Sequence, residues 1–163
     1  MTDNHSELLS QAIAGLHLRD IVLFSSRFER PTPPPESPDV EVLVQTKRQV
    51  RFERGETSEA GNVQQHLQVV VELGLRVVKN TDPDATVYFE IEADFLAEYE
   101  VRNEIAEDAV RVFSELNSVH NVWPFWRQHV FDVVQRGRLP HVEVPLFAVQ
   151  QTKREQAAVK TDE

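Results

Sequence analysis

The side chains that could do chemistry are scattered along this 163-residue chain. Its six histidines stand at positions 5, 17, 66, 120, 129 and 141. No two of them are four residues apart, the spacing that places two metal ligands on one face of a helix. The chain has no cysteine, which excludes thiolate zinc sites, thiol nucleophiles and disulfide bonds. We therefore expect neither a metal site nor a cofactor.

Catalytic motifs are also missing from the sequence. The five glycines stand singly, so there is no glycine-rich phosphate loop, and no G-x-S-x-G nucleophile elbow is present. Acidic residues alternate with apolar ones in the segments that resemble strands. Such carboxylates should face water and keep ordinary pKa values, which does not suit general acid work. The sequence does not indicate an enzyme.

Aromatic side chains are instead concentrated in one segment. Residues 121–127 read NVWPFWR and contain both tryptophans of the chain. On a helix, Trp123 and Phe131 lie off the apolar line that runs through Trp126 and Val130. A helix that is apolar on two sides needs a second burial partner, which would be another subunit or an apolar ligand.

The elements that must position these residues are predicted from hydrophobic periodicity. We expect helices at 6–18 and 103–117, strands at 19–29, 40–54, 63–79 and 86–96, and a last helix at 121–137. In that last helix Asn121 should be the N-cap, Pro124 should lie in the first turn, and Gly137 should mark the end. The alternation of the strands is typical of an antiparallel sheet with one buried and one wet face. The sequence therefore predicts an α+β fold.

The connections are predicted from turn-forming residues. Turns are expected at 56–62 and 80–84, so that the strands 63–79 and 86–96 form a hairpin. The strand 19–29 has imperfect alternation, so it should carry a bulge or be buried on both faces. The proline-rich residues 31–38 should form a stiff connection across the sheet.

The C-terminal part continues this organisation. Residues 141–147 should form an extended tailpiece bracketed by prolines, and the polar tail 151–163 should be disordered. We expect one domain over residues 1–150.

Composition limits the partners of the protein. Its formal net charge of -10 and pI near 5.1 argue against nucleic acid as a partner. The basic cluster of Lys47, Arg48, Arg51 and Arg54 is interrupted by acids, which is typical of a solvated strand edge. No apolar run is long enough for membrane insertion, and the first residues do not resemble a signal peptide. We therefore expect the protein in the cytoplasm.

Three places in the sequence resemble the SecB family of protein-export chaperones. The sequence LRDIVLF at 18–24 resembles the first strand of the family, and the proline-rich connection follows it. The sequence YFEIE at 88–92 resembles the fourth strand. NVWPFWR, followed by RGRLP and VPLF at 136–140 and 144–147, resembles the long helix and its proline-rich exit. The resemblance covers residues 18–147.

This resemblance implies a fold and an activity. The protomer would have a four-stranded antiparallel sheet with a crossover connection after strand 1, covered by a short helix and a long C-terminal helix. It would assemble as a homotetramer, a dimer of dimers. It would be an ATP-independent holdase that keeps unfolded preproteins export-competent and passes them to the SecA motor.

The resemblance also implies site residues. Positions that receive SecA in the family correspond to Asp20, Tyr88 and Glu90, whereas Phe24 replaces a family acid, which weakens the SecA assignment. The resemblance and the aromatic segment together predict an apolar groove for unfolded clients. Its predicted residues are Trp123, Trp126, Phe131, Leu139, Val142, Leu146 and Phe147.

Alternatives remain open at this point. Some SecB-like proteins guard the antitoxin of a toxin–antitoxin system, and this chain could be one of them. A small-molecule binding domain with an apolar, lipid-like ligand is a second alternative. The acidic stripe of Tyr88, Glu90, Glu92 and Asp94 is either a solvated face or a docking face for a basic partner.

Overall fold

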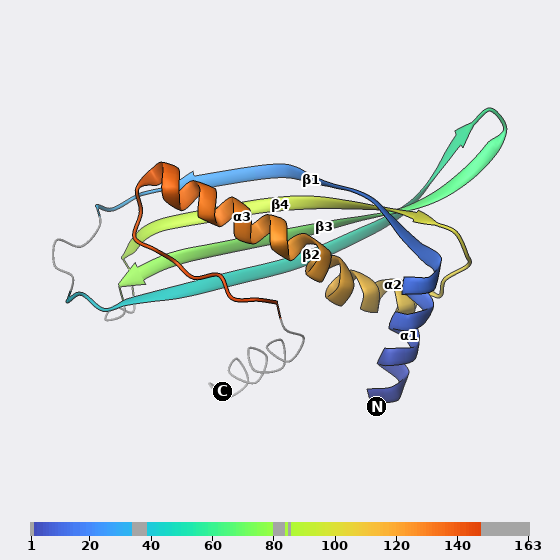
Figure 1. Ribbon diagram of the computed structural model, residues 1–163, viewed down its shortest axis with the longest axis horizontal. Helices are drawn as coiled ribbons and strands as arrows, with labels where there is room; N and C mark the ends of the chain where they lie inside the picture. The colour runs from blue at the N-terminus through green and yellow to red at the C-terminus, as the bar shows by residue number, and fades with distance from the viewer. Residues whose placement is uncertain (1, 34–38, 80–83, 85, 148–163) are drawn as a thin grey trace. The chain divides into compact units, whose positions relative to one another are not determined.

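The computed structural model describes residues 2–33, 39–79, 84 and 86–147, which divide into two units, residues 1–122 and 123–163. Figure 1 labels the elements except η1. In chain order they are α1 (Thr2–Gly15), β1 (Leu16–Glu29), β2 (Val42–Glu59), β3 (Asn62–Lys79), β4 (Val87–Val101), α2 (Glu107–Phe113), the π-helix η1 (Ser114–Ser118) and α3 (Val119–Gly137). The predicted α+β class is confirmed. The boundary expected at residue 150 and the tail 151–163 lie outside the described residues.

The four strands form one antiparallel sheet in the order β1-β4-β3-β2. The connection from β1 to β2 therefore crosses from one edge of the sheet to the other, as predicted, although residues 34–38 of it lie outside the described residues. The predicted hairpin of β3 and β4 is also confirmed, with Leu75 opposite Ile91.

Alternation gives the sheet one apolar and one polar face. On β3 the odd-numbered residues from Leu67 to Val77 are buried, and they pair in register with odd-numbered residues of β4, from Phe89 to Tyr99. The even-numbered residues of both strands, among them Glu72 and Glu92, form the outer face of the sheet. Period-two patterning therefore predicted correctly which face of the central strands is buried.

The strand boundaries differ from the prediction in several places. A loose turn was expected at 56–62, but β2 continues to Glu59, and the turn consists of Ala60 and Gly61 with φ of 50° and 84°. Positive φ at both central residues matches the twist of a tight hairpin. The turn expected at 80–84 lies mostly outside the described residues. β4 ends at Val101 instead of residue 96, because its alternation continues through Ala97 and Tyr99.

The start of β1 also differs from the prediction. The first helix was expected to reach residue 18, but α1 ends at Gly15. The Gly15 carbonyl accepts a hydrogen bond from Arg102 N at 2.8 Å, and a Cβ at this position would lie 2.8 Å from Ile105 Cδ1. The close approach of Gly15 to Ile105 lies where the chain passes from α1 into β1. The predicted bulge in β1 is confirmed by two register shifts, whereas most of the strand is exposed rather than buried on both faces.

The helical region is more continuous than expected. α2 begins at Glu107, and η1 joins it to α3, so Asn121 is not an N-cap and Pro124 lies inside a helix. Asn121 instead donates from Nδ2 to the hydroxyl of Tyr99 at 3.0 Å. Tyr99 also packs edge-to-face on Phe113, with ring centroids 5.0 Å apart. The side chain of Asn121, which was predicted to cap the helix, therefore makes a tertiary hydrogen bond instead.

The predicted end of the last helix is confirmed at Gly137. The left-handed residue is the next one, Arg138, with φ of 49°. Leu139 N donates to Val134 O at 3.0 Å and Arg138 N to Gln135 O at 3.2 Å. These two bonds form a Schellman motif, which satisfies the last carbonyls of the helix and releases the chain in a new direction.

Candidate functional site

α3 carries apolar side chains that differ sharply in exposure. Trp126 and Val130 are buried, whereas Phe125 and Phe131 are 49% and 54% exposed. The off-line position predicted for Phe131 agrees with this exposure. Phenylalanine rings left half in water are available for contact with a partner.

The segment that follows α3, residues 139–147, is called here the exit segment. Two side chains of α3 hold it. Trp123 Nε1 donates to the carbonyl of Pro145 at 2.7 Å, and Arg127 Nε donates to the carbonyl of Val144 at 3.0 Å. The rings of Trp123 and Phe147 are in contact, with centroids 5.3 Å apart. The exit segment therefore runs back along α3 and is fixed near Trp123.

A groove lies between α3 and the exit segment, and we call it the exit groove. Its volume is about 650 Å³, within the range usual for ligand sites. From α3 it is lined by Pro124, Arg127, Gln128, Val130, Phe131 and Val134, and from the exit segment by His141, Val142, Glu143, Val144 and Pro145. The exit groove thus has apolar side chains on both sides, interspersed with Arg127, Gln128, His141 and Glu143.

Four of the predicted client-binding residues belong to this arrangement. Phe131 and Val142 line the exit groove directly. Trp123 and Phe147 do not line it, but their contact holds the exit segment in place. The structure therefore gives the two pairs different tasks, and their part in client binding stays a prediction.

The other three predicted residues lie elsewhere. Trp126 and Leu139 are buried, and Leu146 is 71% exposed but does not line the exit groove. The ring of Trp126 stacks on His129 with centroids 6.3 Å apart. Burial lowers the pKa of His129; the charge of Asp132 opposes this shift and the charge of Arg136 adds to it.

Sequence reasoning missed the polar residues of the exit groove. Pro124, Arg127, Gln128 and Phe131 have helical spacing, so they form one stripe along α3. A search for apolar residues alone does not detect this stripe, because half of it is polar. The helical spacing of these residues relative to Phe131 was the sequence signal that could have identified the stripe.

The outer face of the sheet was the second candidate surface. Glu92 and Glu72 on this face are paired with cations of other strands. Lys47 of β2 contacts Glu92, and Arg27 of β1 reaches the same carboxylate at 3.8 Å. Arg51 Nε donates to Glu72 Oε1 at 2.8 Å. Glu92 of the stripe is therefore neutralised within the sheet, which at this carboxylate favours a solvated face over a docking face for a basic partner.

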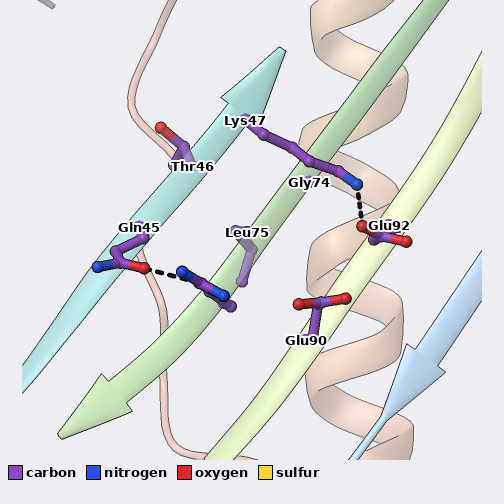
Figure 2. Close-up of a pocket in the computed structure, with 8 residues that line it drawn as sticks. Gln45, Thr46, Lys47, Gly74, Leu75, Glu90 and Glu92 are labelled. Carbon is purple, nitrogen blue, oxygen red and sulfur yellow. Dashed lines mark hydrogen bonds and ion pairs between the residues drawn. The ribbon is translucent and has the colours of Figure 1, made fainter. Parts of the chain in front are cut away.

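Figure 2 shows how one of these ion pairs is arranged. Lys47 crosses the backbone of β3 at Gly74 to reach Glu92 on β4, while Gln45 Oε1 accepts from Arg76 Nε at 2.6 Å. A Cβ at Gly74 would lie 2.7 Å from Lys47 Cε. Arg54 of the same basic cluster lies on the other face of the sheet, where it donates to the carbonyl of Ile105 at 2.8 Å. The basic cluster of β2 is therefore divided between the two faces.

The three residues carried over for SecA binding are not brought together in the protomer. Asp20 pairs with Glu98, eight residues along β4 from Glu90, which corresponds to roughly 27 Å at the usual rise of a strand. Tyr88, expected on the polar face, is buried. Within this protomer the three residues therefore do not form one surface.

Two further observations concern the described part of the chain. No group of three or more histidine and acidic side chains in it could hold a metal ion. None of its helices is long and apolar enough to cross a membrane.

Comparison with known proteins adds structural relatives only. No model of a known protein family matches the sequence, and no curated protein matches it. The structure is similar to that of Mycobacterium tuberculosis Rv1957, a SecB-like chaperone solved in complex with a ChAD peptide from the HigA1 antitoxin. The TM-score is 0.63 at 15% identity, over 88% of this chain and 99% of that one. This chain has a SecB-like fold. The architecture that the resemblance of short segments predicted is therefore confirmed.

A protein of unknown function from Streptococcus agalactiae gives a TM-score of 0.40 at 14% identity, over 80% of this chain and 97% of that one.

Proposed function

We propose that this SecB-like protein is an ATP-independent holdase that binds extended, aggregation-prone polypeptides. The observation that carries the proposal is the exit groove, whose apolar walls come from α3 and the exit segment. Burying one large apolar side chain contributes about 1.5–3 kcal/mol without selecting a sequence. A folded protein hides such side chains, so the groove selects unfolded segments.

The client class that we propose is an antitoxin of a toxin–antitoxin system. Support comes from the neighbour in fold, which was solved with an antitoxin peptide. General export of preproteins with transfer to SecA is the second candidate. It has less support, because Asp20 on β1 lies opposite Glu98, eight residues along β4 from Glu90, and because Glu92 is already paired with Lys47 and Arg27.

We also propose a homotetramer. Support comes from β1, an edge strand with large apolar side chains in water, including Phe24 at 66% exposure. Several grooves on one assembly would multiply weak contacts along one unfolded chain.

Replacing Phe131 tests the holdase proposal. Phe131→Ser removes an apolar wall of the exit groove, so affinity for an unfolded client should fall roughly tenfold, as expected for the loss of ~1.4 kcal/mol or more. The measurement is suppression of light scattering by a denatured antitoxin at rising chaperone concentration. Phe125→Ser is the matched control, because Phe125 is a similarly exposed ring of α3 that does not line the groove.

An equal loss of client affinity in the two variants would mean that the client binds elsewhere. If the unaltered protein did not suppress aggregation, the holdase proposal would be refuted. A denatured preprotein with and without SecA distinguishes the two client classes. Tight binding of a fatty acid, with no effect on aggregation, would instead support a small-molecule binding domain.

A further inference from the structure

We propose that the π-helix η1 sets the rotational phase of α3, so that it decides which side of α3 is buried and which side is left exposed. The inference goes beyond the proposed function, because it assigns a task to an element that does not itself line the exit groove. It holds whatever the groove binds.

The buried face of α2 shows which side of α3 a regular helix would bury. That face consists of Ala109, Val110 and Phe113. An α-helix turns by about 100° per residue, so on an uninterrupted α-helix the face would continue through positions 117, 120, 124, 127 and 131. The residues at these positions are Asn117, His120, Pro124, Arg127 and Phe131.

The structure buries a different side of the helix. His120, Pro124 and Phe131 are exposed, whereas Val119 and Val122 are fully buried. On an uninterrupted α-helix Val122 would lie on the side opposite to the buried face of α2. The apolar side of the sequence is therefore out of phase between α2 and α3.

η1 provides the change of phase. Its hydrogen bonds run from residue i to residue i+5, so the turn contains one residue more than an α-helical turn and delays the following helix by about 100°. This delay brings Val122 towards the buried face that α2 defines, and it turns Pro124 and Phe131 away from it. The hydrogen bond from Asn121 to the buried Tyr99 then fixes the start of α3 in this phase.

The change of phase accounts for the side chains of the exit groove. Without it, the buried face would contain Arg127, whose charge is costly to remove from water. With it, Trp126 and Val130 are buried, and Pro124, Arg127 and Phe131 are left to line the groove. One surplus residue in η1 thus leaves the groove stripe exposed.

Deletion of one residue from η1 in the full chain tests this inference. Deletion of Glu115, which is exposed, should convert η1 into regular α-helix and leave the phase of α3 unchanged. The chain has no cysteine, so Phe131→Cys and Val130→Cys each introduce a single thiol. With or without the deletion, the thiol at position 131 should react with a maleimide at least roughly tenfold faster than the thiol at position 130, which reacts only after local opening.

Deletion of His120 is the matched control, because it removes an equally exposed residue just beyond η1. In this variant α3 can keep its phase only if Val119 moves to the exposed position of His120. The urea midpoint of unfolding should therefore fall, whereas deletion of Glu115 should preserve or raise it.

A reversed ratio of labelling rates after deletion of Glu115 would mean that α3 has rotated together with α2, and it would overturn the inference. Equal losses of stability in the Glu115 and His120 deletions would contradict it too. Deletion of Asn117 removes the surplus residue in a second way. If neither η1 deletion folds, no residue of η1 is surplus and the inference is wrong.

Discussion

Among single residues, Asp94 differs from the other acids of the sheet's outer face. Burial raises its pKa, the negative charge of Glu72 raises it further, and Arg51 opposes both only in part. Glu100 shows the opposite effect, because a hydrogen bond from Arg102 lowers its pKa. The sequence predicted ordinary pKa values for the acids that alternate along residues 86–96, which is wrong for Asp94, because burial and a charge on a neighbouring strand shift its pKa.

Asp94→Asn should stabilise the protein at pH 7. The folded-state pKa of Asp94 is raised, so its ionised form opposes folding at neutral pH. That penalty disappears as the pH falls through the folded pKa towards the ordinary aspartate pKa of 3.8. The free energy of unfolding in urea should therefore be higher for the variant at pH 7 and equal to that of the unaltered protein at pH 3.

Asp84→Asn is the control, because Asp84 is exposed and its replacement removes one negative charge in the same way. A stabilisation that is equal in both variants would reflect net charge rather than the surroundings of Asp94.

At the scale of elements, α3 contains a proline shortly after a π-helix. Pro124 has no N–H to donate to the carbonyl four residues earlier, and η1 ends at Ser118, immediately before α3 begins. Both features depart from regular helical hydrogen bonding. Helix propensity therefore cannot explain the continuity of this region, and tertiary contacts such as that of Asn121 with Tyr99 must contribute.

Pro124→Ala should raise the free energy of unfolding. It restores a backbone donor within a helix, where proline costs on the order of 3 kcal/mol relative to alanine. Part of that gain is offset, because alanine gives the unfolded chain more conformational entropy than proline does, which favours unfolding by roughly 0.4–1 kcal/mol. Urea unfolding at fixed protein concentration measures the net change, which we expect to be about 1–2 kcal/mol.

Pro140→Ala provides the comparison, because Pro140 lies beyond the helix and only the effect on the unfolded chain applies there. Destabilisation by both substitutions would mean that Pro124 is required for the local structure of α3.

For the molecule as a whole, β1 is the strand that we propose for association. It is an edge strand, and Val22, Leu23 and Phe24 are 42%, 48% and 66% exposed. A long apolar edge strand is a template for pairing with another chain unless charges or prolines protect it. The register shift between Leu23 and Ser25 lies within this stretch.

Phe24→Lys should therefore reduce the size of the assembly. Light scattering after size-exclusion chromatography should give about four times the 18.7 kDa chain mass for the unaltered protein and a smaller mass for the variant. Val63→Lys, at a residue of β3 that is 64% exposed, should keep the original mass. A monomeric unaltered protein would contradict the proposed tetramer.

The sequence by itself determined the local pattern of this protein. Alternation along β3 and β4 fixed their buried face, and the Arg-Gly-Arg sequence at 136–138 marked the end of α3. These features depend on neighbours within a few residues, so a single chain segment contains enough information to predict them.

Only the tertiary structure decided what the candidate site contains. Trp123 meets Pro145 across 22 positions, and Lys47 meets Glu92 across 45. These contacts depend on strand register and on the direction in which the exit segment leaves α3, which no local periodicity encodes. The aromatic segment was therefore recognisable in the sequence, whereas the split between Phe131 in the groove and Trp123 as an anchor was not.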